Sequence, residues 1–163
     1  LLQGNQDAYI RQLWELLLQQ TPGDLDTFRE LRDQYEADEW IAQREEIFRR
    51  LPAYAHIEQL YQEEKLYDRL LDFVLQSAGI QTLLQYTDDL KQHYPDQLLQ
   101  KYRDELNQLA TYSGDRRKYQ EFVSILRTMQ KISGGAKAVD EIVAEWKIQY
   151  KNRPAMMDEL RKL

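Results

Sequence analysis

Residues 66–79, Leu-Tyr-Asp-Arg-Leu-Leu-Asp-Phe-Val-Leu-Gln-Ser-Ala-Gly, contain the pattern that decides the fold. Apolar side chains recur there every three or four residues, which places them on one face of an α-helix. Glycine at position 79 is a typical helix-ending residue. The stretch therefore predicts a helix with a wide apolar stripe that is deeply buried. The stripe consists of Leu66, Tyr67, Leu70, Leu71, Val74 and Leu75.

The same kind of stretch recurs along the 163 residues, each closed by a Gly or Pro signal, with no strand-like alternation between them. Asp24 and Asp38 are predicted N-caps, and Pro154 suits the first turn of a short last helix. The other predicted helices have their apolar positions at Ile10, Leu13, Trp14 and Leu17; Leu25, Phe28, Leu31 and Tyr35; Trp40, Ile41, Ile47, Phe48 and Leu51; Ile57, Leu60 and Tyr61; Leu83, Leu84, Thr87 and Leu90; Leu98, Leu99, Tyr102, Leu106 and Leu109; Tyr119, Phe122, Val123, Leu126 and Met129; Val139, Ile142, Val143, Trp146 and Tyr150.

These helices predict an all-α fold of about 9–10 helices. Residues 35–40 resemble residues 61–67, with an offset of about 26 residues that needs a one-residue gap. Antiparallel helical hairpins stacked as an α-solenoid, a TPR-like right-handed superhelix, are favoured over a closed bundle. No linker divides the chain, so residues 1–163 are expected to form one repeat-like domain. Because the first residue is Leu1, we expect a C-terminal fragment of a larger protein.

Composition narrows the function classes. The formal net charge of −6 disfavours a broad nucleic-acid or anionic-membrane surface, because both polyanions repel an acidic domain. No stretch approaches the roughly 18 apolar residues of a membrane span, so a soluble, cytoplasmic protein is expected. The absence of cysteine removes disulfides, thiolate zinc sites and thiol nucleophiles.

The last 70 or so residues resemble the C-terminal helical region of bacterial SWIM zinc finger proteins. The resemblance rests on residues 93–96 (His-Tyr-Pro-Asp), 102–105 (Tyr-Arg-Asp-Glu), 117–120 (Arg-Lys-Tyr-Gln) and 146–160, which end in Arg-Pro-Ala-Met-Met-Asp-Glu-Leu. It implies a helical scaffold that accompanies a zinc module elsewhere in a longer chain, where that module contacts nucleic acid or protein. The family's Cys-x-Cys and Cys-x-His ligands have no counterpart here, so no metal ligand is carried over.

No catalytic, cofactor-binding or metal-binding residue is predicted. His56 and His93 are expected on different helices, and a metal site would need a carboxylate beside both. Adjacent carboxylates on a helix point about 100° apart, so the acidic clusters are interpreted as solvated faces. These clusters are Glu36, Asp38 and Glu39; Glu45 and Glu46; Glu63 and Glu64; and Asp88 and Asp89.

The most basic portion has two interpretations. It comprises Arg116, Arg117, Lys118, Arg127, Lys131 and Lys137. With Tyr112 and Tyr119 nearby it suggests phosphate contacts with base stacking, whereas the favoured interpretation packs Tyr119 inward and pairs the early arginines with Glu121 or a neighbouring helix. Gly134 and Gly135 are interpreted as a helix connection. Trp14, Trp40 and Trp146 are expected in the core.

Three hypotheses of function remain. The first is a non-catalytic helical scaffold that binds a protein partner, or other domains of its own full-length chain, through aromatic and charged side chains. The second is an accessory module of a zinc-finger nucleic-acid-binding protein, with nucleic acid reached through the upstream part. The third, an enzyme, would need an apolar pocket around a perturbed carboxylate or histidine. No membrane partner is expected.

Overall fold

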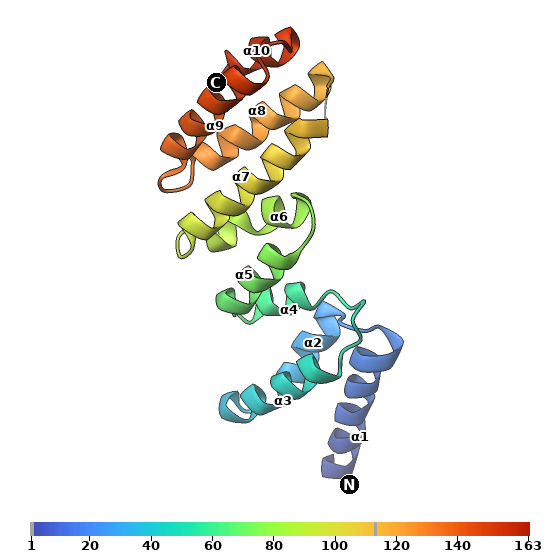
Figure 1. Cartoon of the computed structure of the whole chain (residues 1–163). Coiled ribbons are helices and arrows are strands. Elements are labelled where there is room, and N and C mark those ends of the chain that lie inside the picture. The colour runs from blue at the N-terminus through green and yellow to red at the C-terminus, as the bar shows by residue number, and fades with distance from the viewer. Residues whose placement is uncertain (1, 113) are drawn as a thin grey trace. The chain divides into compact units, whose positions relative to one another are not determined.

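The computed structural model describes residues 2–112 and 114–163. Within those residues it contains ten α-helices, one π-helical turn and no strand, which confirms the all-α prediction. Contacts divide the chain into two compact units, residues 1–66 (unit 1) and 67–163 (unit 2), each with its own buried side chains (Figure 1). The single domain over residues 1–163 stays a prediction.

Unit 1 contains α1 (Leu2–Glu15), the π-helical turn η1 (Leu16–Gln20), α2 (Leu25–Arg32), α3 (Ala37–Arg50) and α4 (Ile57–Glu63). Helix α2 lies at its centre, because it packs against α1, η1 and α4. Large apolar side chains are buried together in the core, and all of them except Leu18 belong to the stripes that the helical spacing predicted. They are Leu13, Leu17, Leu18, Phe28, Leu31, Trp40, Ile47 and Leu60.

The structure refines one helix end in unit 1 and corrects one helix start. The first helix continues as a π-turn, in which the Thr21 amide donates to the Leu16 carbonyl at 2.8 Å. Asp24 caps α2 as predicted, accepting from the Thr27 amide at 3.0 Å. Asp38 as the N-cap of α3 is wrong. The helix begins two residues earlier, because Glu39 reaches back to the Glu36 amide in a capping box and leaves Asp38 in the first turn.

Unit 2 contains α5 (Tyr67–Gln76), α6 (Gln81–Leu90), α7 (Pro95–Tyr112), α8 (Arg116–Gln130), α9 (Gly135–Gln149) and α10 (Pro154–Leu160). Consecutive helices from α5 to α9 pack on one another, and α7 also packs on α9 while α8 packs on α10. Side chains from α5 to α10 fill the interior, among them Leu71, Tyr102, Tyr119, Val123 and Trp146. The burial expected for the α5 stripe is confirmed for Leu70, Leu71 and Val74, whereas Leu66, Tyr67 and Leu75 are only half-buried.

The α8–α9 connection depends on two glycines. Gly134 has a φ of 80°, in the left-handed region that side chains other than glycine rarely adopt. A Cβ at Gly135 would lie 1.7 Å from the Met129 carbonyl oxygen, so only glycine fits there. The interpretation of this pair as a helix connection is confirmed. Pro154 stands in the first turn of α10, also as predicted.

The predicted core tryptophans differ in burial. Trp40 and Trp146 are buried, and the Trp146 indole donates to Asn107 Oδ1 at 2.8 Å. Trp14 is only half-buried. It packs at the edge of the unit 1 core, donates to the Tyr35 hydroxyl at 3.0 Å and carries the Arg50 guanidinium over its ring. An amphipathic indole suits such an edge position, since its polar end keeps a partner while the ring stays packed.

Candidate functional site

An adjacent acidic pair in unit 1 is held by arginines from another helix. Glu63 ends α4 and Glu64 follows it. Arg32 of α2 spans both side chains: its Nη1 donates to Glu64 Oε2 at 2.8 Å and its Nη2 to Glu63 Oε1 at 3.2 Å. Arg29 also binds Glu63, through Nε at 2.8 Å and Nη2 at 3.1 Å. The carboxylates thus bind guanidinium groups, whose planar fork suits two oxygens.

Glu64 is the more enclosed member of the pair. Its side chain is only 7% exposed and also accepts from the Trp40 indole and, at 3.4 Å, from Arg44, both on α3. One carboxylate therefore links α2 and α3 to the end of α4. The interpretation of Glu63 and Glu64 as a solvated face is wrong, because it considered only the helix that carries them and not arginines from other helices.

A second acidic pair, in unit 2, is also spanned by an arginine from another helix. Arg116 Nη1, at the start of α8, donates to Asp158 Oδ2 at 3.0 Å and to Glu159 Oε1 at 2.7 Å, both on α10. The Glu159 side chain is 3% exposed and also accepts from Lys162 at 3.0 Å. This confirms, for Arg116, the prediction that the early arginines pair with a neighbouring helix. The pair itself was missed, although its two adjacent acids were visible in the sequence.

Hydrogen bonds to these cations lower the carboxyl pKa values. The pKa of Glu63 lies below its usual value chiefly because Arg29 donates to it, and that of Asp158 chiefly because Arg116 does. The pKa of Glu159 is lowered first by Lys162 and then by Arg116. These are the shifts of ion pairs that hold helices together. A general acid would need the opposite shift.

The remaining acidic clusters are more open. Glu36, Asp38 and Glu39 are exposed, and so is Asp88, which confirms the solvated interpretation for them. The side chains of Glu45 and Glu46 are each more than a third exposed and pair with Arg44 and Arg49.

The two histidines lie in different units. His56 stands just before α4 with its side chain 75% exposed, and His93 follows α6 and stacks on Tyr67. Among residues 2–112 and 114–163, no group of three or more His, Cys, Asp or Glu side chains is arranged to hold a metal ion.

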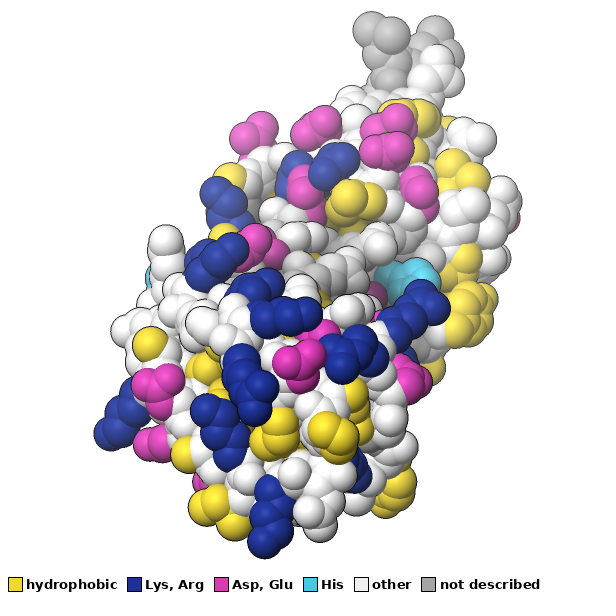
Figure 2. Space-filling model, turned by 90° about the horizontal axis from the view of Figure 1, so that it is seen from above, with side chains coloured by type: hydrophobic (Ala, Val, Ile, Leu, Met, Phe, Trp, Pro, Cys, Tyr) yellow, Lys and Arg dark blue, Asp and Glu magenta, His cyan; other side chains and the backbone are white. Residues whose placement is uncertain are grey.

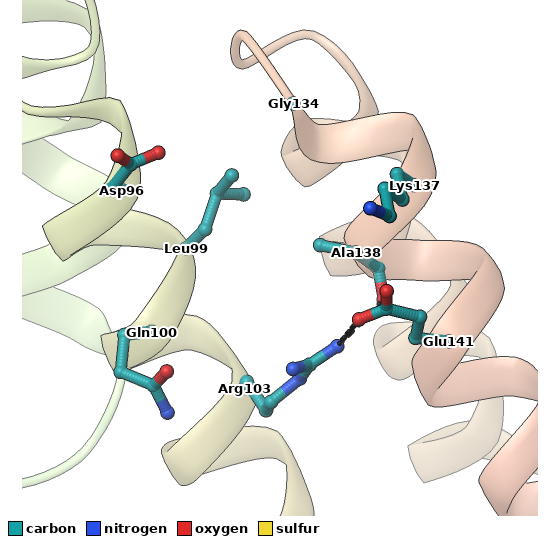
Figure 3. A pocket seen from close by; sticks show the side chains of 8 residues that line it. All are labelled: Asp96, Leu99, Gln100, Arg103, Gly134, Lys137, Ala138 and Glu141. Atoms are coloured by element: carbon teal, nitrogen blue, oxygen red, sulfur yellow. Dashed lines mark hydrogen bonds and ion pairs between the residues drawn. The ribbon is translucent and has the colours of Figure 1, made fainter.

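A polar pocket of about 260 Å³ lies between α7 and α9 (Figure 3). Arg103 reaches across from α7 and donates to Glu141 Oε2 at 2.6 Å and to the Ala138 carbonyl at 3.4 Å, while its buried Nε has no hydrogen-bond partner among the described residues. Asp96 and Lys137 complete the charged lining. The charges of the two cations, Arg103 and Lys137, balance those of the two carboxylates, Asp96 and Glu141.

An open groove of about 540 Å³ lies along α9 and α10. Apolar side chains supply much of its lining, and charged or amide side chains complete it. One turn beyond Ala144, the Ile148 side chain is 77% exposed. The groove residues are Gln130, Val139, Asp140, Val143, Ala144, Lys147, Leu160, Arg161 and Leu163.

Charge is unevenly divided between the units. Unit 1 has 7 Lys and Arg against 14 Asp and Glu, whereas residues 116–163, the basic segment, have 11 against 6. Figure 2 faces the end of unit 2 that carries α10, and Lys and Arg side chains gather there. The overall charge of −6 conceals this division, which counting along the chain would have revealed. Within the segment, Lys118 pairs with Glu121 and Arg127 donates to the Lys162 carbonyl.

No family model, no curated protein and no solved structure matches the chain. No helix in the described part of the chain is long and apolar enough to cross a membrane.

Proposed function

We propose that this chain is a non-catalytic, cytoplasmic helical scaffold that binds another polypeptide. Its hairpins would stack as a TPR-like α-solenoid. Contacts between helices two apart in sequence, α2 with α4, α7 with α9 and α8 with α10, support this arrangement, since each hairpin of a solenoid packs on the next. A catalytic role is not proposed, because the enclosed carboxylates Glu64 and Glu159 are bound by arginines.

The exposed apolar surface of α9 is the observation that carries this proposal. Ile148 lies one turn beyond Ala144 on the helix, and Val143 and Leu160 extend the apolar surface into the groove. Burying one aliphatic side chain of this size contributes about 1.5–3 kcal/mol. Lys147 and Arg161 lie beside this apolar surface, as charged side chains surround the centre of a protein interface.

Photo-crosslinking from position 148 tests the proposal. A photoreactive phenylalanine replaces Ile148 in one bait and Tyr112, which is 84% exposed at the end of α7, in a matched control. We expect a discrete protein adduct from position 148 in native lysate, resistant to nuclease and lost when Ala144 is replaced by Glu. The same adducts from both positions, or none from position 148, would contradict the proposal.

A second candidate is the accessory module of a zinc-finger nucleic-acid-binding protein. Two observations favour it: the resemblance of the C-terminal helices to SWIM zinc finger proteins, and the excess of cations in the basic segment. Fluorescence anisotropy with labelled duplex and single-stranded DNA tests it. Binding that weakens steeply with salt and is lost in the variant Lys147→Glu, Lys151→Glu would favour this candidate. Crosslinked adducts that disappear with nuclease would do the same.

A further inference from the structure

Two exposed helix faces, one in each unit, have similar side chains but opposite charges. On α3 the face consists of Asp38, Ile41, Ala42 and Glu45, and Ile41 is 53% exposed. The second face belongs to α9 and to the second residue after its end. It consists of Ala144, Lys147, Ile148 and Lys151, with Ile148 77% exposed.

The spacing is the same in both faces. Residues at i, i+3, i+4 and i+7 share one side of a helix, so the α3 set forms a continuous strip about two turns long. On α9 the strip consists of Ala144, Lys147 and Ile148, and Lys151 follows in the turn after the helix. The α3 face has an isoleucine and an alanine between two acids. The α9 face has its isoleucine between two lysines. Packed helices lie about 8–10 Å apart, close enough for the two isoleucines to meet while acids and lysines pair around them.

The charged members of both faces remain accessible. Asp38 is exposed in the first turn of α3, and Glu45 keeps 39% of its side chain exposed beside Arg44. Lys147 and Lys151 are exposed and form no ion pair within the described residues. Charge complementarity extends beyond the faces, since unit 1 has twice as many acids as bases and the basic segment has the reverse excess. Long-range attraction therefore favours the encounter of α3 with α9.

We propose that a second copy of this chain docks through its α3 face on the α9 face of the first. This inference rests on the proposed function and names the partner. The contact is heterologous, so each copy keeps one unused face and association continues head to tail. Two helical turns on each side form a small interface, and the association is therefore weak and sensitive to salt.

Sedimentation velocity over a concentration series tests this proposal. The weight-average sedimentation coefficient of the wild type is expected to rise with concentration at about 50 mM NaCl and much less at about 500 mM. Ile148→Asp and Ile41→Lys each place the wrong charge in an exposed face and are expected to weaken association at least about tenfold. Tyr54→Asp, at a 75% exposed position outside both faces, is the matched control and should leave association unchanged.

Mixing the two variants gives the sharpest outcome. Ile148→Asp keeps a working α3 face and Ile41→Lys a working α9 face, so their mixture should form a 1:1 dimer and nothing larger. A wild type that stays monomeric at every concentration, or a mixture that forms no dimer, would overturn the inference. If position 148 then crosslinks a different protein, the proposed function stands without self-association. If it crosslinks nothing, both fail.

Discussion

In each unit one arginine from another helix spans both members of an adjacent acidic pair, but the two pairs are supported differently. Glu64 accepts from Arg32, Arg44 and Trp40, which lie on two helices. Glu159 accepts from Arg116 on α8 and from Lys162, three residues along its own chain. The first carboxylate therefore joins three chain segments of unit 1, and the second chiefly joins α8 to α10.

This difference shows what adjacent acids on a helix can do. Their side chains diverge, so they do not converge on one metal ion, but a planar guanidinium from another helix can reach both. In each pair the second acid is nearly buried and the first is more exposed. Such pairs specify which helices meet, while apolar burial supplies most of the stability.

The largest expected effect comes from placing a charge in the apolar core of unit 2 while the residues of both acidic pairs stay unchanged. Val123→Asp places a charge at a position that is 3% exposed, and should destabilise unit 2 by about 4 kcal/mol or more. Hydrogen exchange should show protection lost in α8–α10 even though Arg116, Asp158 and Glu159 are intact. Ser124→Asp, on the exposed side of α8, is the control and should keep protection. Retained protection in Val123→Asp would mean that Val123 does not face the core of unit 2.

Leu71→Ala measures the contribution of one buried side chain. Leu71 is 7% exposed on α5, and its truncation leaves a cavity that should cost about 2–4 kcal/mol in urea unfolding. Asp72→Ala changes the neighbouring exposed position and should stay within about 0.5 kcal/mol. Equal losses in the two variants would contradict the burial of α5.

Glu64→Gln compares the acidic pairs directly. It keeps the shape of the side chain but removes the charge that faces Arg32 and Arg44, and should cost about 1–3 kcal/mol. Glu159→Gln should lower the melting temperature less, because Glu159 has fewer donors from other helices. A larger drop in melting temperature for Glu159→Gln would show that Glu159 contributes more to stability than Glu64. Arg32→Lys should weaken unit 1 as well, since an ammonium does not span both carboxylates.

The smallest effect is a decline in stability at acid pH. Because the folded-state pKa of Glu63 lies below 4.5, its pairing stabilises unit 1 fully above that value and is lost as the pH falls through the folded pKa. The pKa of Asp158 is likewise lowered from its ordinary value of 3.8, so its pairing in unit 2 is also lost as the pH falls through the folded-state pKa. Melting temperatures should therefore be flat above about pH 5 and fall by a few degrees in acid. In the Arg29→Ala variant, the pKa of Glu63 measured by NMR should be higher than in the wild type. An unchanged pKa would contradict Arg29 as the main cause of the lowered value.

Much of the architecture was predictable because helical periodicity and turn residues are local properties. The apolar positions of α5, the glycines between α8 and α9 and Pro154 at the start of α10 were identified from sequence. The start of α3 was misplaced, since Asp38 and Glu36 are both acidic and only the backbone shows which one precedes the helix. The π-turn after Glu15 leaves no distinctive pattern in sequence, because it changes one hydrogen-bond register.

The candidate surfaces were harder to predict. Ile41 was assigned to the apolar stripe of its helix, yet it is exposed, whereas Ile148 was in no predicted stripe. Spacing alone does not say which side of a helix another helix covers.

The sequence by itself determined an all-helical chain, the approximate ends of its helices and the uneven charge along it, because these depend on near neighbours and on composition. Only the tertiary structure decided that Glu63 and Glu64 bind arginines from α2 and α3, that Arg116 spans Asp158 and Glu159, and that Ile41 and Ile148 stay in solvent. These outcomes depend on which helix faces meet across gaps of about 20 to 40 residues, which local periodicity does not encode.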